Sequence, residues 1–239
     1  MANKLREDPL TDFVLVHGAW HGAWCWRRVL PALWKQGHRV FTVSLTGVGE
    51  RAHLLSPTIT LDTHIEDVVS VLVAEELENC VLVGHSYAGT VITGAAARQP
   101  QRIWKLVYLD AVVPRPGEAW STGHPETIQK ERRHLIAERG MLPPPDPAIF
   151  GLTGADRDWV ARRLTPQPGG VYDAPVTFNE VAWLAMPRTF IDCHDPALPS
   201  MAGMRDRVRA QPGWTVVEMA TGHDAMISAP EQLVAALLA

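Results

Sequence analysis

Short apolar runs alternate with longer, partly polar segments along most of this 239-residue chain. Such a run, closed by a turn residue, favours a buried strand over a surface helix. The first run, FVLVH, is closed by Gly18 in this way. The pattern predicts six strands, over Phe13–His17, Arg39–Val43, Cys80–Gly84, Lys105–Leu109, Arg188–Asp192 and Trp214–Met219.

Helical patterns fill most of the intervals between these strands. We expect helices over Trp26–Gln36, from Thr63 onward, over residues 88–97 and from Pro230 onward. Gly37 is a suitable C-terminal cap for the first of them. Thr63 with Glu66, and Ser228 with Glu231, have the spacing of a capping box and predict two of the helix starts.

Strands separated by helices predict a doubly wound, mainly parallel sheet with helices on both faces. Residues 11–113 and 188–239 would form this α/β core. Residues 114–187 are rich in proline and contain no convincing strand, and they are too many for a simple loop. We therefore predict a small, mostly helical cap over residues 114–187, and a flexible leader over residues 1–10.

Composition narrows the classes of partner and compartment. Hydrophobic residues make up 46% and charged residues 20%, as in ordinary globular proteins. The net charge of −4 comes without a basic stripe, which argues against nucleic acid and anionic membranes as partners. The N-terminal sequence MANKLREDPLTD lacks the apolar core of a signal peptide, and no apolar run is long enough to span a bilayer.

The three cysteines indicate the redox environment. Cys25, Cys80 and Cys193 are odd in number and have no CxxC spacing, which is typical of reduced thiols inside a cell and not of a disulfide framework. We therefore predict a cytoplasmic protein.

The segment Gly84-His85-Ser86-Tyr87-Ala88-Gly89 follows a predicted strand and precedes a predicted helix. A serine in this setting lies on a cramped strand-to-helix turn that exposes its hydroxyl above the sheet. Small residues at both ends of the turn let the two backbones approach each other. Ala88 departs from the usual glycine by one methyl group. Ser86 is therefore the predicted nucleophile.

A serine nucleophile needs a base to take its proton and an acid to orient that base. In folds of this kind the chain order is serine, acid, histidine. His223 lies between the last strand and the last helix and is the predicted base. Asp195, just beyond a strand, is the favoured acid, while Asp110 and Asp192 remain alternatives.

The segment His17-Gly18-Ala19-Trp20 follows the first strand. One of its backbone N–H groups, with that of Tyr87, can form an oxyanion hole. The spacing of His17 and His21 alone predicts no metal site, because no carboxylate or cysteine accompanies them. We expect a substrate-binding surface formed by Gly18, Trp20, His85, Trp120 and Trp183.

The segments FVLVHGAWHGAWCW and GHSYAG, and the spacing of Asp195 and His223, resemble the α/β-hydrolases that include plant methylesterases, hydroxynitrile lyases and bacterial carboxylesterases. The resemblance begins at Phe13, covers nearly the whole chain and is weakest in the cap. It implies the α/β-hydrolase fold with the cap after the sixth-strand position, and no cofactor. It also implies a catalytic triad and two oxyanion donors: Ser86, Asp195 and His223, with Ala19 and Tyr87.

The lyases of this family have threonine where Gly18 stands and lysine directly after the catalytic histidine, where this chain has Asp224. A lysine would hold a departing cyanide, whereas an aspartate would repel it. We therefore predict a serine hydrolase that cleaves a small-molecule carboxylic ester through an acyl-enzyme. A hydroxynitrile lyase, a lactone or amide hydrolase and a ligand receptor on the same fold are the alternatives. The sequence leaves the oligomeric state open, with a homo-oligomer as one option.

Overall fold

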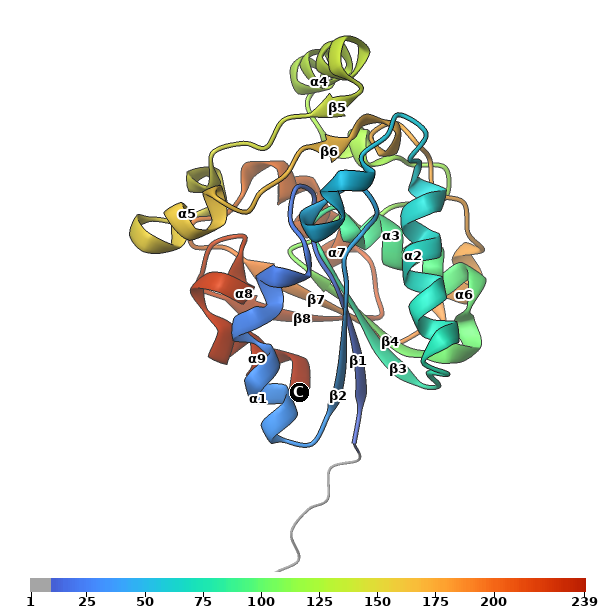
Figure 1. The fold of residues 1–239 in the computed structure, drawn as a ribbon. Helices are drawn as coiled ribbons and strands as arrows, with labels where there is room; N and C mark the ends of the chain where they lie inside the picture. Colours follow the sequence, from blue (N-terminus) through green and yellow to red (C-terminus); the bar gives the residue numbers. More distant parts are fainter. Residues whose placement is uncertain (1–9) are drawn as a thin grey trace, which may run out of the picture.

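The computed structural model describes residues 10–239, so the predicted leader lies, apart from Leu10, outside the described residues. All six predicted strands are confirmed, and they form one parallel sheet in the order β2-β1-β3-β4-β7-β8 (Figure 1). Their bounds are β1 Asp12–Val16, β2 Arg39–Val43, β3 Cys80–His85, β4 Ile103–Leu109, β7 Arg188–Cys193 and β8 Trp214–Met219.

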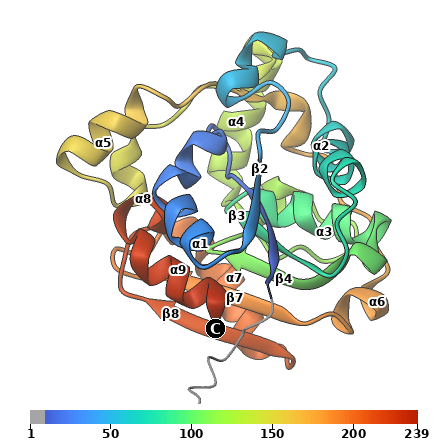
Figure 2. The same ribbon diagram turned by 60° about the horizontal axis from the view of Figure 1, so that its bottom comes forward.

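Helices cover both faces of the sheet, as the doubly wound prediction requires. In Figures 1 and 2, α1 and α9 lie on one side of the strands, and α2 and α3 lie on the other. The bounds in the core are α1 Leu30–Lys35, α2 Leu61–Ala74, α3 Ala88–Arg98, α7 Ala202–Ala210, α8 Ala225–Ser228 and α9 Pro230–Leu238, with a 3-10 helix, η1, over Ala23–Arg28. The helix predicted over Trp26–Gln36 is thus divided between η1 and α1.

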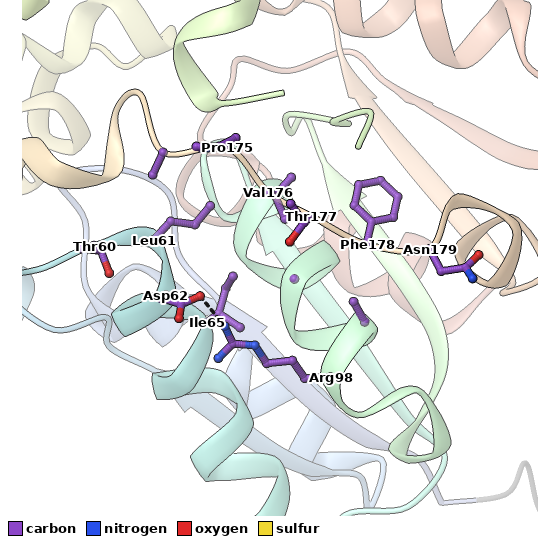
Figure 3. A pocket seen from close by; sticks show the side chains of 13 residues that line it. Thr60, Leu61, Asp62, Ile65, Arg98, Pro175, Val176, Thr177, Phe178 and Asn179 are labelled. Carbon is purple, nitrogen blue, oxygen red and sulfur yellow. Dashed lines mark hydrogen bonds and ion pairs between the residues drawn. The ribbon is translucent and has the colours of Figure 1, made fainter. Parts of the chain in front are cut away.

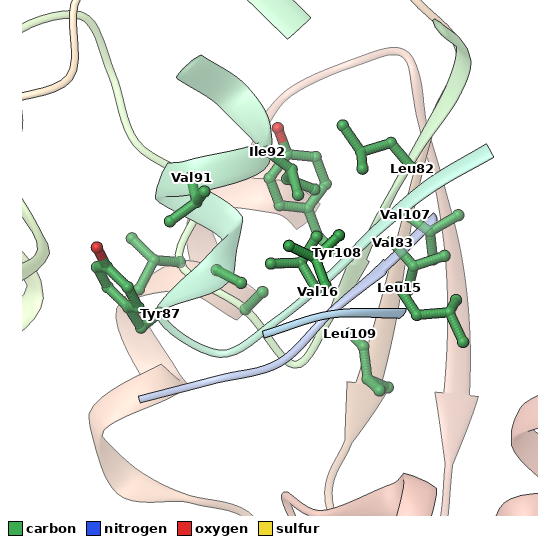
Figure 4. Packing of buried hydrophobic residues seen from close by; sticks show 14 of the residues in the cluster. Leu15, Val16, Leu82, Val83, Tyr87, Val91, Ile92, Val107, Tyr108 and Leu109 are labelled. Atoms are coloured by element: carbon green, nitrogen blue, oxygen red, sulfur yellow. The ribbon is translucent and has the colours of Figure 1, made fainter. Parts of the chain in front are cut away.

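The core lies between the central strands and α3 (Figure 4). Every residue of β3 is buried, and the inward side chains of β1, β3 and β4 are fully covered. Helix α3 approaches closely because it is built from small residues. A Cβ on Gly94 would lie 2.3 Å from Ile65 Cδ1 of α2, which is shorter than any van der Waals contact. The small residues of α3 therefore let α2 pack directly against it.

Neither predicted capping box is the one that forms. Helix α2 begins one turn earlier than expected, because the Thr60 hydroxyl accepts from the Thr63 backbone N–H and the Thr63 hydroxyl accepts from that of Thr60. Ser228 belongs to α8, and its hydroxyl is hydrogen bonded to Thr221. Helix α9 then starts at Pro230 without a side-chain cap.

Residues 114–187, the predicted cap, connect β4 to β7 through short helices and irregular segments. They contain α4 Glu126–Arg139, α5 Gly154–Ala161 and α6 Glu180–Leu184. The prediction missed a short antiparallel pair, β5 Met141–Leu142 with β6 Gln167–Pro168. Two-residue strands are too short to show an alternating pattern. In Figure 1, α4 lies above this pair, at the upper end of the molecule.

Arg132 anchors the exposed helix α4 to a cluster of aromatic side chains. Its guanidinium carbon lies 5.2 Å from the ring centre of Trp120, and 5.5 Å from those of Trp20 and Tyr172. Its Nη1 also donates to His124 Nε2 over 3.1 Å. Burial and the neighbouring guanidinium lower the pKa of His124 to about 4, so that ring is neutral and can accept.

Replacing Arg132 with methionine should weaken the docking of α4 by about 1–2 kcal/mol, because the cation–π contacts are lost while much of the apolar stem is kept. Hydrogen–deuterium exchange should then be faster across residues 126–139. Lys130→Met is the control, since Lys130 makes an exposed ion pair with Glu126 on the same helix. Equal exchange in the two variants would remove Arg132 from this role.

The structure also describes the state of the cysteines and the character of the helices. The three cysteines are free and buried, and burial raises the pKa of Cys80 to about 12. Within residues 10–239, no helix combines the length and the apolar character needed to cross a membrane.

Candidate active site

Ser86 lies on the sharp turn between β3 and α3, with a φ of +55° and a half-buried side chain. Its backbone N–H donates to the Leu109 carbonyl over 3.1 Å, which ties the turn to β4. A Cβ at position 84 would lie 2.8 Å from the Ala88 carbonyl oxygen, so Gly84 allows the strand and the helix to meet. This is the strand, turn and helix arrangement that the motif predicted.

Two other residues near Ser86 in the fold share its unusual backbone. Trp20, after β1, has a φ of +65°, and Asp110, directly after β4, has a φ of +39°. The strands β1, β3 and β4 are neighbours in the sheet, so all three residues lie at its carboxyl edge. Ligands of open parallel sheets bind at this edge, and strained backbone gathers at functional sites. The strained residues Trp20 and Asp110 therefore lie at the same edge of the sheet as the Ser86 motif.

His223 is hydrogen bonded to Asp110. The His223 Nδ1–H donates to Asp110 Oδ2 over 2.6 Å, and both side chains are buried. Asp110 Oδ1 accepts from Arg205 Nη2 over 2.7 Å. The carboxylate is thus fixed between the arginine of α7 and the imidazole, with one oxygen turned toward each.

The preference for Asp195 as the orienting acid is wrong in this structure. Asp195 is exposed in the turn after β7, and its backbone N–H donates to the Thr221 carbonyl. Asp192 is buried, but its carboxylate binds Arg205 over 2.6 Å. Asp110 reaches His223 because the left-handed turn after β4 directs its side chain toward the last loop.

The backbone N–H groups of Ala19 and Tyr87 are available as oxyanion donors. The Trp20 N–H donates to Gln167 Oε1 over 2.9 Å, and the His21 N–H donates to the Gly18 carbonyl. In the described part of the chain, no hydrogen bond uses the Ala19 or the Tyr87 N–H. These two donors therefore flank the serine without an internal acceptor.

Gly18 brings the segment after β1 into contact with the nucleophile. A Cβ on Gly18 would lie 2.9 Å from Ser86 Cβ and 2.8 Å from His85 Nδ1. His85 itself is fully buried, and its Nε2–H donates to the His223 backbone carbonyl over 3.0 Å. His85 therefore holds the loop of His223 from below the surface, and its contact with substrate stays a prediction.

Trp20 and Trp120 lie together beside Tyr87, and their role in binding substrate stays a prediction. Their ring centres are 5.7 Å apart, and Trp120 is 5.0 Å from Tyr87. Trp183 does not join them. Its indole N–H donates to the Tyr108 hydroxyl over 2.9 Å, in a separate aromatic cluster with Trp214.

Phe150 of the cap is a site residue that the sequence did not identify. Its ring centre is 5.6 Å from that of His223 and 6.5 Å from that of Trp20. The surrounding segment is rich in proline and has no periodic pattern, so no local signal marks this side chain. Its contact with His223 brings the segment 114–187 to the candidate site.

Several buried histidines lie near the site. His17 Nδ1–H donates to the Gly18 carbonyl, its Nε2 accepts from the Leu45 N–H, and burial lowers its pKa to about 3. His85, His223 and Asp224 have ligand atoms within 4.8 Å of one another. Their hydrogen bonds to neighbouring protein groups make this trio part of an acid–base network, and we do not assign a metal to it.

One groove lies elsewhere on the surface (Figure 3). It has a volume of about 730 Å³ and is lined by residues of α2, α3 and the segment 174–179. Arg98 in its wall is paired with Asp62 and Glu66. Neither Ser86 nor His223 lines it, so the groove is not the catalytic pocket.

The chain is similar in sequence to known proteins. Residues 13–237 match the model of the alpha/beta hydrolase family. A carbendazim hydrolyzing esterase from Nocardioides sp. is 41% identical over 243 residues, which cover 96% of this chain and 99% of the relative. Methylesterase 1 of Arabidopsis thaliana is 30% identical over 254 residues, with 95% of each chain covered.

The fold also matches solved structures. An extracellular alpha/beta-hydrolase from a Paenibacillus species superposes with a TM-score of 0.85 at 22% identity, covering 96% of this chain and 98% of the other. A pyrethroid hydrolase gives a TM-score of 0.75 at 24% identity, with 96% of each chain covered. At these identities the two structures support the fold alone.

Proposed function

Since this chain belongs to the alpha/beta hydrolase family, we propose that it is a serine esterase whose triad is Ser86, His223 and Asp110. The hydrogen bond of 2.6 Å between His223 and Asp110, formed beside the strained turn of Ser86, carries this proposal. The relatives named as esterases support the same class of enzyme.

The first half of the reaction would form an acyl-enzyme. The Ser86 hydroxyl attacks the ester carbonyl while His223 Nε2 takes its proton, and Asp110 stabilises the resulting imidazolium. The negative oxygen of the tetrahedral intermediate accepts from the Ala19 and Tyr87 N–H groups. Each such donor contributes about 3 kcal/mol to lowering the barrier. Collapse of the intermediate releases the alcohol, which takes the proton from His223.

The second half would return the enzyme to its starting state. Water attacks the acyl carbonyl as His223 again takes a proton, and the same two N–H groups hold the second tetrahedral oxygen. Ser86 then leaves with the proton from His223, and the acid is released. These steps use protein groups and water throughout, so atoms and charge balance with an ester and one water as reactants.

The aromatic side chains near the triad favour an ester with a flat or apolar part. Phe150 packs against His223, Trp20 packs against Phe150 and Trp120, and Trp120 packs against Tyr87, the residue that follows Ser86. The names of the relatives suggest methyl esters and carbendazim as first substrates. The test compares p-nitrophenyl acetate, p-nitrophenyl butyrate, methyl benzoate and carbendazim. Sustained turnover is expected, whereas a single-turnover burst without turnover would favour a ligand receptor.

No release of cyanide from mandelonitrile is expected above the spontaneous background. A threonine at position 18 would collide with Ser86 and His85, and Asp224 is buried in a pair with His21 where a lyase would need a positive charge. The measurement follows cyanide release alongside ester turnover in the same preparation. A lyase rate comparable to the esterase rate would overturn the assignment of Gly18 and Asp224.

A further inference from the structure

A second buried histidine–carboxylate pair lies next to the proposed triad. His21 Nε2–H donates to Asp224 Oδ2 over 3.1 Å, and His21 Nδ1–H donates to the Ala19 carbonyl over 2.8 Å. Both side chains are at most 1% exposed. Because the two ring nitrogens of His21 both face acceptors, the ring carries both protons and is an imidazolium.

The surroundings of this pair favour the charged form of His21. Burial alone would lower its pKa, but the charge and hydrogen bond of Asp224 and the Ala19 carbonyl together raise the pKa of His21 above its usual 6.5. The same contact lowers the pKa of the Asp224 carboxyl despite its burial. The other titratable groups facing His21 are His17 and His85, and burial lowers the pKa of both. One positive and one negative charge are therefore held side by side.

The pair connects the two segments whose relative position matters most for the proposed reaction. His21 holds the carbonyl of Ala19, the residue whose N–H is the proposed oxyanion donor. Asp224 directly follows the base, His223. His85 adds a second contact, with its Nε2 3.7 Å from Asp224 Oδ1 while it donates to the His223 carbonyl.

The segment 17–20, which carries the Ala19 N–H and is called the oxyanion segment, needs contacts from outside itself to keep its conformation. Trp20 has a φ of +65°, a conformation that a tryptophan does not keep without constraints from its surroundings. Gln167 accepts from the Trp20 N–H on one side of the Ala19–Trp20 peptide, and His21 donates to the carbonyl on the other. The Ala19 N–H belongs to the neighbouring peptide group, across the Ala19 Cα, so its direction depends on how these two contacts fix the Ala19–Trp20 peptide.

We propose that the His21–Asp224 ion pair positions the Ala19 N–H for the oxyanion, as a device separate from the His223–Asp110 pair. This inference rests on the proposed esterase function. His21 and Asp224 are positioning residues, because they act through the Ala19 peptide and do not touch the reacting atoms. The pair thereby joins the oxyanion segment to the loop that carries the base.

The test is Asp224→Asn, which keeps the shape of the side chain and removes its charge. Loss of one oxyanion donor lowers kcat by about 10²–10³, so a misplaced donor should lower kcat by about 10–100-fold while KM changes little. A second readout is the alkaline limb of the pH profile. Activity needs the charged imidazolium and falls as pH rises through the pKa of His21. Without the carboxylate that raises this pKa, the fall should occur at a lower pH.

Asp12→Asn is the matched control. Asp12 pairs with Arg39 at the amino end of β1, the opposite end of the sheet from the site. It should leave kcat and the alkaline limb unchanged. If Asp224→Asn is poorly folded, the double variant His21→Gln with Asp224→Asn removes both charges together and should show the same loss of kcat.

The outcomes separate this inference from the proposed function. Absence of ester turnover in the wild type would overturn the esterase itself. Turnover in the wild type with an unchanged kcat and alkaline limb in Asp224→Asn would overturn only the positioning role. An equal loss of kcat in Asp12→Asn would also overturn it, because the effect would then follow from any lost ion pair.

Discussion

Ester turnover should fall by about 10⁶-fold when Ser86 is replaced by alanine, because the nucleophile is lost while the rest of the site is kept. The fold should persist, since the change removes one hydroxyl from a half-buried side chain. Alanine and serine carry a similar strain at a φ of +55°, so the turn gains no new penalty. Circular dichroism and the melting temperature check the fold, and the rate on p-nitrophenyl butyrate checks the activity.

A fluorophosphonate probe gives an independent measure of the same residue. It should label the wild type once, on Ser86, and leave Ser86→Ala unlabelled. Ser70→Ala, an exposed change on α2, is the control and should label like the wild type. Labelling at a different serine, or ester turnover that survives in Ser86→Ala, would show that the nucleophile lies elsewhere.

Local sequence patterns were sufficient to predict the sheet and to select the proposed nucleophile and base. Each strand is a short apolar run, and burial on both faces of a parallel sheet requires that pattern. The turn at Ser86 requires small residues at positions 84 and 88. The motif can therefore be recognised from the sequence alone, without knowledge of the rest of the fold. His223 follows from chain order, because it is placed between the last strand and the last helix.

The acid could not be chosen in the same way. Asp110, Asp192 and Asp195 all lie at or just beyond the carboxyl ends of neighbouring strands. The backbone twist at Asp110 and the arginine of α7 that holds its carboxylate decide between them, and both are tertiary features. The partner of Asp224 was equally hidden, since His21 is 203 residues away in sequence.

The cap shows a different limit. Its aromatic residues carry no periodic signal, so Trp183 was assigned to the site and Phe150 was overlooked. In the structure, Phe150 lies beside His223 and Trp183 does not. Trp183, a residue of α6, is hydrogen bonded to Tyr108, whereas Phe150 contacts His223. Which face of an irregular segment turns inward depends on its docking, which composition does not encode.

Asp110→Asn should lower kcat by about 10⁴-fold, because asparagine favours the wrong tautomer of the base and leaves its cation unstabilised. That loss corresponds to about 5.5 kcal/mol of transition-state stabilisation. Asp195→Asn should change kcat by no more than about threefold, as expected of a surface substitution. The comparison decides directly between the acid that the sequence favoured and the one that the structure pairs with His223.

Asp110 has a second partner, Arg205, so a loss of activity must be separated from a loss of folding. Asp192→Asn provides that separation. Asp192 is equally buried and binds the same arginine, but it makes no contact with His223. It should lower the melting temperature to a similar degree while most of the activity is retained. Rates are best expressed per active site, counted with the fluorophosphonate probe, so that unfolded protein does not count as slow enzyme.

The result has three distinguishable forms. A large loss confined to Asp110→Asn, with both control variants active, supports Asp110 as the acid of the triad. A comparable loss in Asp192→Asn would mean that Arg205 and the packing around it are what the reaction needs. The largest loss in Asp195→Asn would require the turn after β7 to move toward His223 when substrate binds. That movement would have to break the hydrogen bond between the Asp195 N–H and the Thr221 carbonyl.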